Sequence, residues 1–201
     1  MTIPKSADMR GRTVDSSSLK GLAHPLRIRI LETLWSYGAN TSCGLAERLG
    51  ESSGSTSYHL RQLARHEFIR KVEGKGTKRE CWWEVMPGGL TLATPDLATD
   101  PATRAASQLV SREFEDTRQQ ALSHFVVNGF ELLPKHWVDA STITTAHFKL
   151  TSKQLAEISA EFEKFHDSVL AKYRGQDEPG ARPVQVHINA FPLIDGEENP
   201  S

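Results

Sequence analysis

The spacing of apolar residues predicts two helices at the start of the folded part of the chain. Residues 1–16 show no periodicity and are expected to form a mobile tail. A helix follows at residues 17–23, and a second begins at Pro25, where the missing N–H of proline costs no hydrogen bond. The second helix ends at Gly38, and its apolar residues recur every three or four positions: Leu26, Ile30, Leu31 and Leu34.

Two further helices are predicted before residue 67. Thr41 caps a short helix over residues 42–49, and Gly50 ends it. Ser52 caps the next helix, which reaches about His66 and turns Leu60, Leu63 and Ala64 inward. Its other face is polar and rich in hydroxyl groups, and comprises Ser53, Ser55, Thr56, Ser57, Tyr58, Arg61, Gln62 and Arg65.

Strand-like runs and a long helix come next. Residues 68–72 and 78–85 read as a hairpin with a glycine-rich, basic tip at residues 73–77. Residues 87–100 are interpreted as a linker. A helix of about 40 Å then starts at Asp100-Pro101 and reaches about Gly129. It is expected to hold a dimer together through an apolar stripe formed by Val110, Phe114, Ala121 and Phe125.

The last third of the chain predicts one helix between two strands. The strands are expected at residues 142–149 and 183–190, the second of which alternates strictly between apolar and polar residues. Thr151 and Gln154 form a capping box for a helix that Gly175 closes. Its apolar stripe, from Leu155 to Tyr173, is expected to serve as core and dimer contact. The predicted fold is therefore α+β, with domains at residues 17–86 and 101–194 and a disordered tail at 195–201.

Charge separates the two halves of this chain of 201 residues, although its net charge is only −1. Residues 1–86 hold 14 Lys and Arg against 9 Asp and Glu, a net charge of +5, and residues 87–201 are acidic. A basic module can bind a polyanion, because Lys and Arg displace counterions from a phosphate backbone. No apolar run is long enough to span a bilayer, and no signal peptide is recognised, so a cytoplasmic protein without membrane contact is expected.

The order of helix, short helix, hydroxyl-rich helix and basic hairpin is that of a winged helix-turn-helix. Such a polar helix face fits the major groove of DNA. Arg61 and Gln62 are expected to reach base edges, and the small hydroxyl residues allow close approach to phosphates. Lys75, Lys78 and Arg79 of the hairpin are expected over the adjacent backbone or minor groove. His59 has two readings, a phosphate contact and a structural hydrogen bond.

Three segments resemble the ArsR-type winged-helix transcriptional regulators: residues 22–31 (LAHPLRIRIL), 45–50 (LAERLG) and 57–63 (SYHLRQL). The resemblance implies a dimeric regulator that binds a palindromic operator and responds to a metal or small molecule. It assigns DNA reading to residues 53–66 and the wing to residues 69–85.

The sequence departs from this family in three places. Metal-sensing members carry a Cys-x-Cys pair in the short helix, whereas here Thr41 stands at the first position and Cys43 at the second. Glu67 stands where the family has a glycine in the left-handed region, at a cost of about 1 kcal/mol. The 115 residues after Met86 have no counterpart in the short metal sensors.

No cofactor, metal site or catalytic centre is expected. The chain lacks a nucleophile elbow, a phosphate-binding loop and a His-Glu-x-x-His helix, and its histidines show no metal-ligand spacing. Cys81 is expected to be an inert buried thiol, and His24 a capping or packing residue. Two alternatives stay open. One is a thiol- or metal-responsive sensor, and the other is a protein-interaction module that has lost DNA binding.

Overall fold

Each of the first two helices begins at a residue whose side chain caps it. The computed structural model describes residues 12–76, 80–86, 90–91, 101–173, 175–176 and 178–197. Asp15 caps α1 (Ser16–Leu22), and the Nδ1 atom of His24 accepts a hydrogen bond from the N–H of Leu26 at the start of α2 (Pro25–Tyr37). The predicted capping role of His24 is confirmed. The predicted tail is too long, because Arg12–Thr13 form strand β1 and Val14 is buried.

The helix-turn-helix follows with the predicted boundaries. Thr41 caps α3 (Ser42–Leu49), Gly50 ends it in the left-handed conformation, and Ser52 caps α4 (Ser53–Arg65). The Oγ atoms of Ser42 and Ser57 lie 2.6 Å apart and join the two helices. Both helices turn their apolar side chains toward α2, so that Leu45, Leu60 and Leu63 are fully buried.

The hairpin is part of a three-stranded antiparallel sheet. Strand β4 (Trp82–Val85) lies between β2 (Asn40–Thr41) and β3 (Ile69–Lys71), with Ile69 opposite Val85 and Lys71 opposite Trp83. Trp83 is buried and Trp82 is half-buried, as expected for neighbours on opposite faces of a strand. A second pairing, of β1 with β5 (Leu90–Thr91), involves residues of the predicted tail and the predicted linker.

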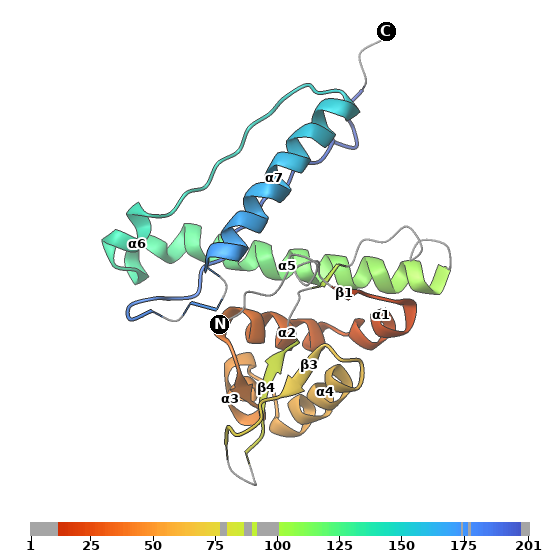
Figure 1. Cartoon of the computed structure of the whole chain (residues 1–201), viewed down its shortest axis with the longest axis vertical. Helices are drawn as coiled ribbons and strands as arrows, with labels where there is room; N and C mark the ends of the chain where they lie inside the picture. Colours follow the sequence, from red (N-terminus) through yellow and green to blue (C-terminus); the bar gives the residue numbers. More distant parts are fainter. Residues whose placement is uncertain are drawn as a thin grey trace. The chain divides into compact units, whose positions relative to one another are not determined.

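The long helix α5 (Pro101–Leu132) begins where predicted and belongs to the N-terminal unit. It lies across α1 and α2 (Figure 1), and Val110 and Phe114 are buried in the same core as Leu19, Leu31 and Leu60. The chain divides into an N-terminal unit, Met1–Asp139, and a C-terminal unit, Ala140–Ser201. The predicted domain boundary before residue 101 is therefore wrong, because the first half of α5 completes the winged-helix core.

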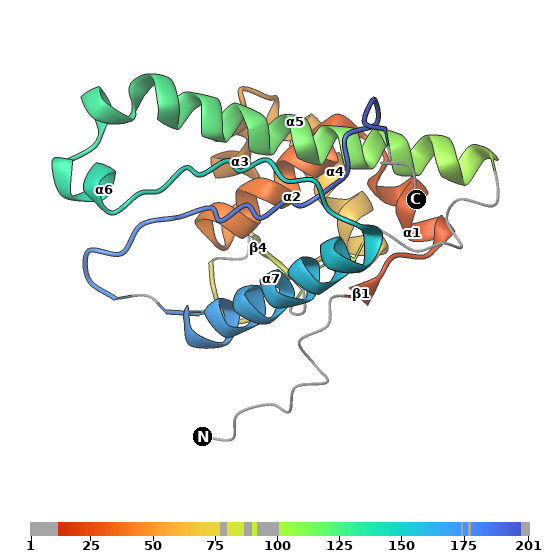
Figure 2. The same cartoon turned by 90° about the horizontal axis from the view of Figure 1, so that it is seen from above.

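The described residues of the C-terminal unit contain one helix. Thr151 and Gln154 form the predicted capping box at the start of α7 (Ser152–Tyr173), with the N–H of Thr151 2.9 Å from Oε1 of Gln154. Residues 141–150 lead from α6 (Lys135–Asp139) to α7, and residues 181–193 return in the direction opposite to that of α7 (Figure 1), apart from the helix in the view of Figure 2. The strands predicted at 142–149 and 183–190 are absent, because neither segment meets a partner strand among the described residues of this unit. The chain as a whole is α+β.

Candidate nucleic-acid interface

One face of α4 is exposed and carries unpaired polar groups. Tyr58 is 52% exposed, Arg61 and Arg65 are exposed, and Gln62 is half-buried. These residues recur at three- and four-residue steps, which places them along one side of the helix. Within the described part of the chain, Arg61 and Arg65 have no hydrogen-bond or ion-pair partner. Both guanidinium groups are therefore available to an outside ligand.

Two of the candidate DNA-binding residues, Thr56 and His59, point into the protein instead. Thr56 is fully buried, and its hydroxyl donates to the carbonyl oxygen of Ser52 at 3.0 Å. His59 is only 8% exposed, and its ring centroid lies 4.2 Å from that of His24. The assignment of Thr56 to the outward face is wrong, because it lies one turn before Leu60 and fills the space at the helix start.

The hydroxyl residues at the start of α4 serve the fold as well as the surface. Ser53 is exposed, Ser55 is half-buried, and the N–H of Ser55 donates to Oγ of Ser52. Ser57 binds Ser42 across the turn. The cluster of serines thus has a structural reason, since small hydroxyl groups allow α3 and α4 to approach closely and satisfy their free amide groups.

The left-handed residue that ends α4 is Glu67, with φ of 56°. The N–H of Glu67 donates to the carbonyl oxygen of Ala64, and the N–H of Phe68 donates to that of Leu63. This pair of bonds is a Schellman motif, in which the residue after the cap must adopt positive φ. The predicted geometry is confirmed, and it sets the direction in which β3 leaves the helix.

The wing presents Lys75 beside an aromatic ring. Its Nζ lies 4.0 Å from the centroid of the half-buried Trp82, so a cation–π contact holds the ammonium group near the tip of the hairpin. Arg70 in β3 is held by Glu84, with Nε 2.7 Å from Oε1. Lys78 and Arg79, also predicted to contact DNA, lie outside the described residues.

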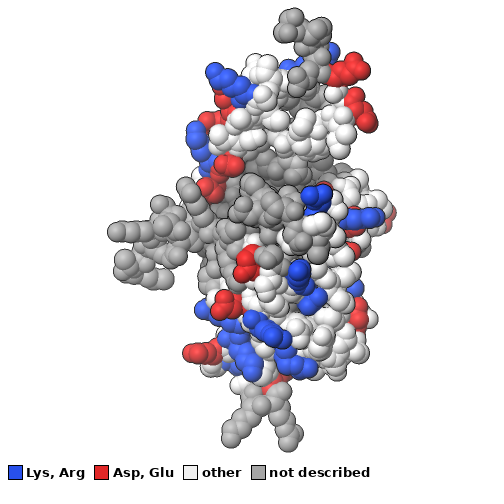
Figure 3. Space-filling model, turned by 90° about the vertical axis from the view of Figure 1, so that its right-hand side faces the viewer, with Lys and Arg blue, Asp and Glu red and all other residues white. Residues whose placement is uncertain are grey.

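Lys and Arg side chains gather on the lower part of the face in Figure 3, which the winged-helix part forms. Such a concentration of positive charge raises the local density of counter-anions and attracts polyanions. In the same part, Arg29 of α2 is engaged by Glu51, with Nη1 3.4 Å from Oε1, and by the carbonyl oxygen of Leu49. Its charge is thereby partly neutralised, whereas the charges of Arg61 and Arg65 are not.

A pair of buried polar atoms beside α4 could not be found from the sequence. Nε of Arg27 and Nδ1 of His59 are buried without a hydrogen-bond partner in the described protein. Burial lowers the pKa of His59, and the neighbouring His24 and Arg27 lower it further. Burial is also the main cause that lowers the pKa of His24. His24 and His59 are far apart in sequence, so their contact is seen only once α2 packs on α4.

Both cysteines are exposed, and they are not neighbours in the sequence. The expectation that Cys81 is buried is wrong, because it precedes the first residue of β4 and turns outward. The described residues contain no group of three or more potential metal ligands from His, Cys, Asp and Glu. None of the described helices is long and apolar enough to cross a membrane.

The family model of a helix-turn-helix domain matches residues 22–72. Among solved structures, the chain is similar to the YusO protein of Bacillus subtilis, with 12% identity, 77% of this chain and 82% of that chain covered, and a TM-score of 0.33.

Two further structures are similar at the same level. The transcriptional regulator Tm0710 of Thermotoga maritima has 11% identity, with 82% of this chain and 90% of that chain covered and a TM-score of 0.31. A mutant of S. aureus MepR bound to an oligodeoxyribonucleotide has 12% identity, with 76% and 87% covered and a TM-score of 0.31.

No curated protein sequence matches the chain. The family model and the arrangement of α2, α3, α4 and the β2–β4–β3 sheet agree with each other. Residues 22–72 therefore have the fold of a helix-turn-helix domain, to which the chain adds a wing.

Proposed function

We propose that the chain is a DNA-binding transcriptional regulator that inserts α4 into the major groove. The observation that carries the proposal is the exposed face of α4, on which Arg61 and Arg65 lack partners in the described protein. Arginine in a major groove donates two hydrogen bonds to guanine, and glutamine pairs in the same way with adenine. Arg61 and Gln62 are thus the base-reading residues of the proposal, and Arg65 and Tyr58 flank them.

The remaining contacts are assigned to the phosphate backbone. Ser53 and Ser55 lie at the amino-terminal end of α4, where the positive end of the helix dipole and small side chains favour an anion. Lys75 at the wing tip adds a positive charge beside the adjacent groove, and Lys78 and Arg79 are proposed for the same role. Ser57 is bound to Ser42, and Thr56 and His59 are buried, so these three position the helix rather than bind DNA.

The proposed regulator is of ArsR type and binds a palindromic operator as a homodimer in the cytoplasm, with a small molecule as its effector. The second half of α5 supports the dimer. Val126 is 54% exposed, Val127 71% and Phe130 83%. At about 100° per residue these side chains lie opposite Val110 and Phe114, so they face away from the winged-helix core. An apolar face turned from its own core is suited to a second copy.

The test compares binding to the chain's own upstream DNA with binding to a random duplex of equal length at several salt concentrations. Arg61→Ala should weaken specific binding by about 1–3 kcal/mol and leave binding to the random duplex unchanged. Arg112→Ala, which removes an exposed arginine from α5, is the matched control and should change neither affinity. Lys75→Ala should weaken both and reduce the salt slope by about one.

Two outcomes would contradict the proposal. Equal losses on both duplexes for Arg61→Ala would show that α4 contacts phosphates without reading bases. Salt-independent or undetectable binding to every DNA would favour the protein-interaction module.

The exposure of both thiols favours one additional candidate function, a response to oxidation. A thiol must be reachable by the oxidant, and Cys43 lies on α3, directly beside the proposed DNA-reading helix. Modification of Cys43 would place a bulky or charged group near the DNA. If so, peroxide or diamide should release DNA from the native chain and not from the Cys43→Ser, Cys81→Ser double variant. Equal release from both proteins would exclude this function.

A further inference from the structure

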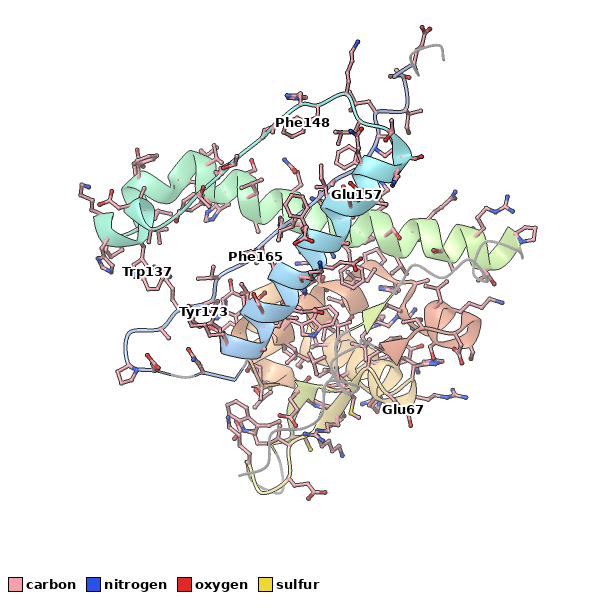
Figure 4. The ribbon with its side chains drawn as sticks, turned by 45° about the horizontal axis from the view of Figure 1, so that its top comes forward. Glu67, Trp137, Phe148, Glu157, Phe165 and Tyr173 are labelled. Carbon is pink, nitrogen blue, oxygen red and sulfur yellow. The ribbon has the colours of Figure 1, made fainter. Side chains whose placement is uncertain are left out.

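The C-terminal unit exposes the apolar residues that a domain normally buries. No residue of α7 is buried, although Leu155, Ile158, Phe162, Phe165, Val169 and Tyr173 form one stripe. Phe148 precedes the helix, and Phe165 and Tyr173 lie along it (Figure 4). Most of the stability of a helix in a protein comes from the packing of its apolar face, and the apolar face of α7 has no such packing among the described residues. The unit therefore needs a partner surface that covers the stripe.

The two extended segments of this unit have the pattern of strands and lack a ladder. Val184 and Val186 are more than half exposed and lie with Ile188 on one side, while Gln185, His187 and Asn189 lie on the other. Such alternation is typical of a sheet with one packed face and one face in water. No strand pairing is found in the described part of residues 140–197. An extended segment with free backbone groups pairs readily with another strand.

The described strands of the N-terminal unit are too short to supply that partner. The edge strands of its three-stranded sheet are β2, with 2 residues, and β3, with 3 residues. Residues 183–190 would leave most of their backbone groups unpaired against either edge. Among the described residues, neither unit therefore supplies a strand of matching length for residues 183–190.

We propose that a second copy of this chain completes the C-terminal unit by strand exchange. Two copies together supply four strand segments and two α7 helices, which is enough for a sheet covered on one face by helices. A two-fold axis relates the two copies, so that both use the same surface in the interface and no further copy can add. The strands at 142–149 and 183–190 form between copies rather than within one.

The exposed area is sufficient for such an interface. Eleven apolar residues of the unit each expose two-fifths or more of their surface: Ile143, Phe148, Leu150, Phe162, Phe165, Tyr173, Val184, Val186, Phe191, Leu193 and Ile194. Together they expose on the order of 1,000 Å² of side chain per copy, given the size of aromatic residues. A stable interface takes about 800 Å² from each partner.

Hydrogen exchange on the full chain without DNA tests the proposal, measured alongside sedimentation over a range of protein concentrations. The inference specifies the dimer of the proposed regulator, but the absence of DNA separates its failure from failure of DNA binding. Amides of residues 184–190 should be protected in the dimer and should lose protection as the chain dissociates. Amides of α2 report independently that the N-terminal unit stays folded.

A pair of charge variants distinguishes the two faces of the segment. Val184→Asp with Val186→Asp should abolish protection of residues 184–190 and raise the dissociation constant of this contact more than about 100-fold, because each buried valine counts twice. Gln185→Asp with His187→Asp adds the same charges to the polar face and should preserve protection.

Three results would overturn the proposal. The first is a native chain whose 184–190 amides are unprotected at every concentration. The second is protection that persists in the monomer, which would mean pairing within one chain. The third is equal protection in both double variants.

Discussion

Glu67 stores backbone strain at the exit of the DNA-reading helix. Its φ of 56° lies in the region that costs a residue with a Cβ about 1–2 kcal/mol. Glu67→Gly should therefore raise the free energy of unfolding by about 1 kcal/mol, measured by urea denaturation. Glu47→Gly in the middle of α3 is the control and should lower it by about 1 kcal/mol, since glycine is a poor helix former. If Glu67→Gly did not raise the free energy of unfolding, the left-handed conformation of Glu67 would cost nothing.

The His24–His59 pair is expected to make the winged helix less stable in acid. Burial lowers the pKa of both rings, so the unfolded chain takes up protons at a higher pH than the folded one. Stability is fully present above the ordinary histidine pKa of about 6.5 and declines as pH falls below it, by up to about 1.4 kcal/mol per pH unit for each proton. Urea denaturation between pH 7.5 and 5 measures this loss.

A substitution separates this pair from the other histidines. His24→Asn keeps a capping side chain and removes one imidazole, so the decline between pH 6.5 and 5 should become shallower. His124→Asn on the exposed side of α5 should leave the curve unchanged. An identical slope in the native chain and His24→Asn would show that other groups cause the acid sensitivity.

At the scale of elements, the two halves of α5 differ in what they support. Phe114 is 3% exposed and its ring centroid lies 5.9 Å from that of Trp35, whereas Phe130 is 83% exposed. Phe114→Ala should destabilise the N-terminal unit by about 3–5 kcal/mol, because it leaves a cavity in the core. Phe130→Ala should change the free energy of unfolding by less than about 0.5 kcal/mol. A larger loss of stability for Phe130→Ala than for Phe114→Ala would instead place Phe114 in a dimer interface, as the sequence predicts.

Local signals predicted the elements of the winged helix, because each helix there carries its own boundary residues. His24, Thr41 and Ser52 cap helices in the structure, and Gly38 and Gly50 end them. The exposed residues of α4 follow from the same periodicity. Periodicity alone could not tell that Val110 and Phe114 pack within the chain, since an apolar stripe looks the same whichever partner covers it. The burial of Thr56 and the meeting of His24 with His59 depend on packing between distant segments.

At the scale of the whole molecule, the two units differ in self-sufficiency. The N-terminal unit contains the whole described core, from Val14 to Phe114, whereas α7 buries nothing. A fragment ending at Asp139 should unfold cooperatively, with a free energy of unfolding within about 1 kcal/mol of that of the same unit in the full chain. Calorimetry and far-UV circular dichroism measure this. A fragment that is unfolded on its own would show that the C-terminal unit supports the winged helix.

The anchoring of α5 has a mechanical consequence. The first half of α5 shares a core with α1 and α2. The second half continues the same helix, and its exposed apolar side chains lie on the side of the helix opposite to Val110 and Phe114. Such a helix is held by the core at one end and is exposed at the other, so it can act as a lever. Because Val110 and Phe114 are packed in the winged-helix core, we expect a shift at the distal half of α5 to turn that core, and α4 with it, as one body. The angle between two such levers in a dimer would then decide whether both reading helices meet the same face of the DNA.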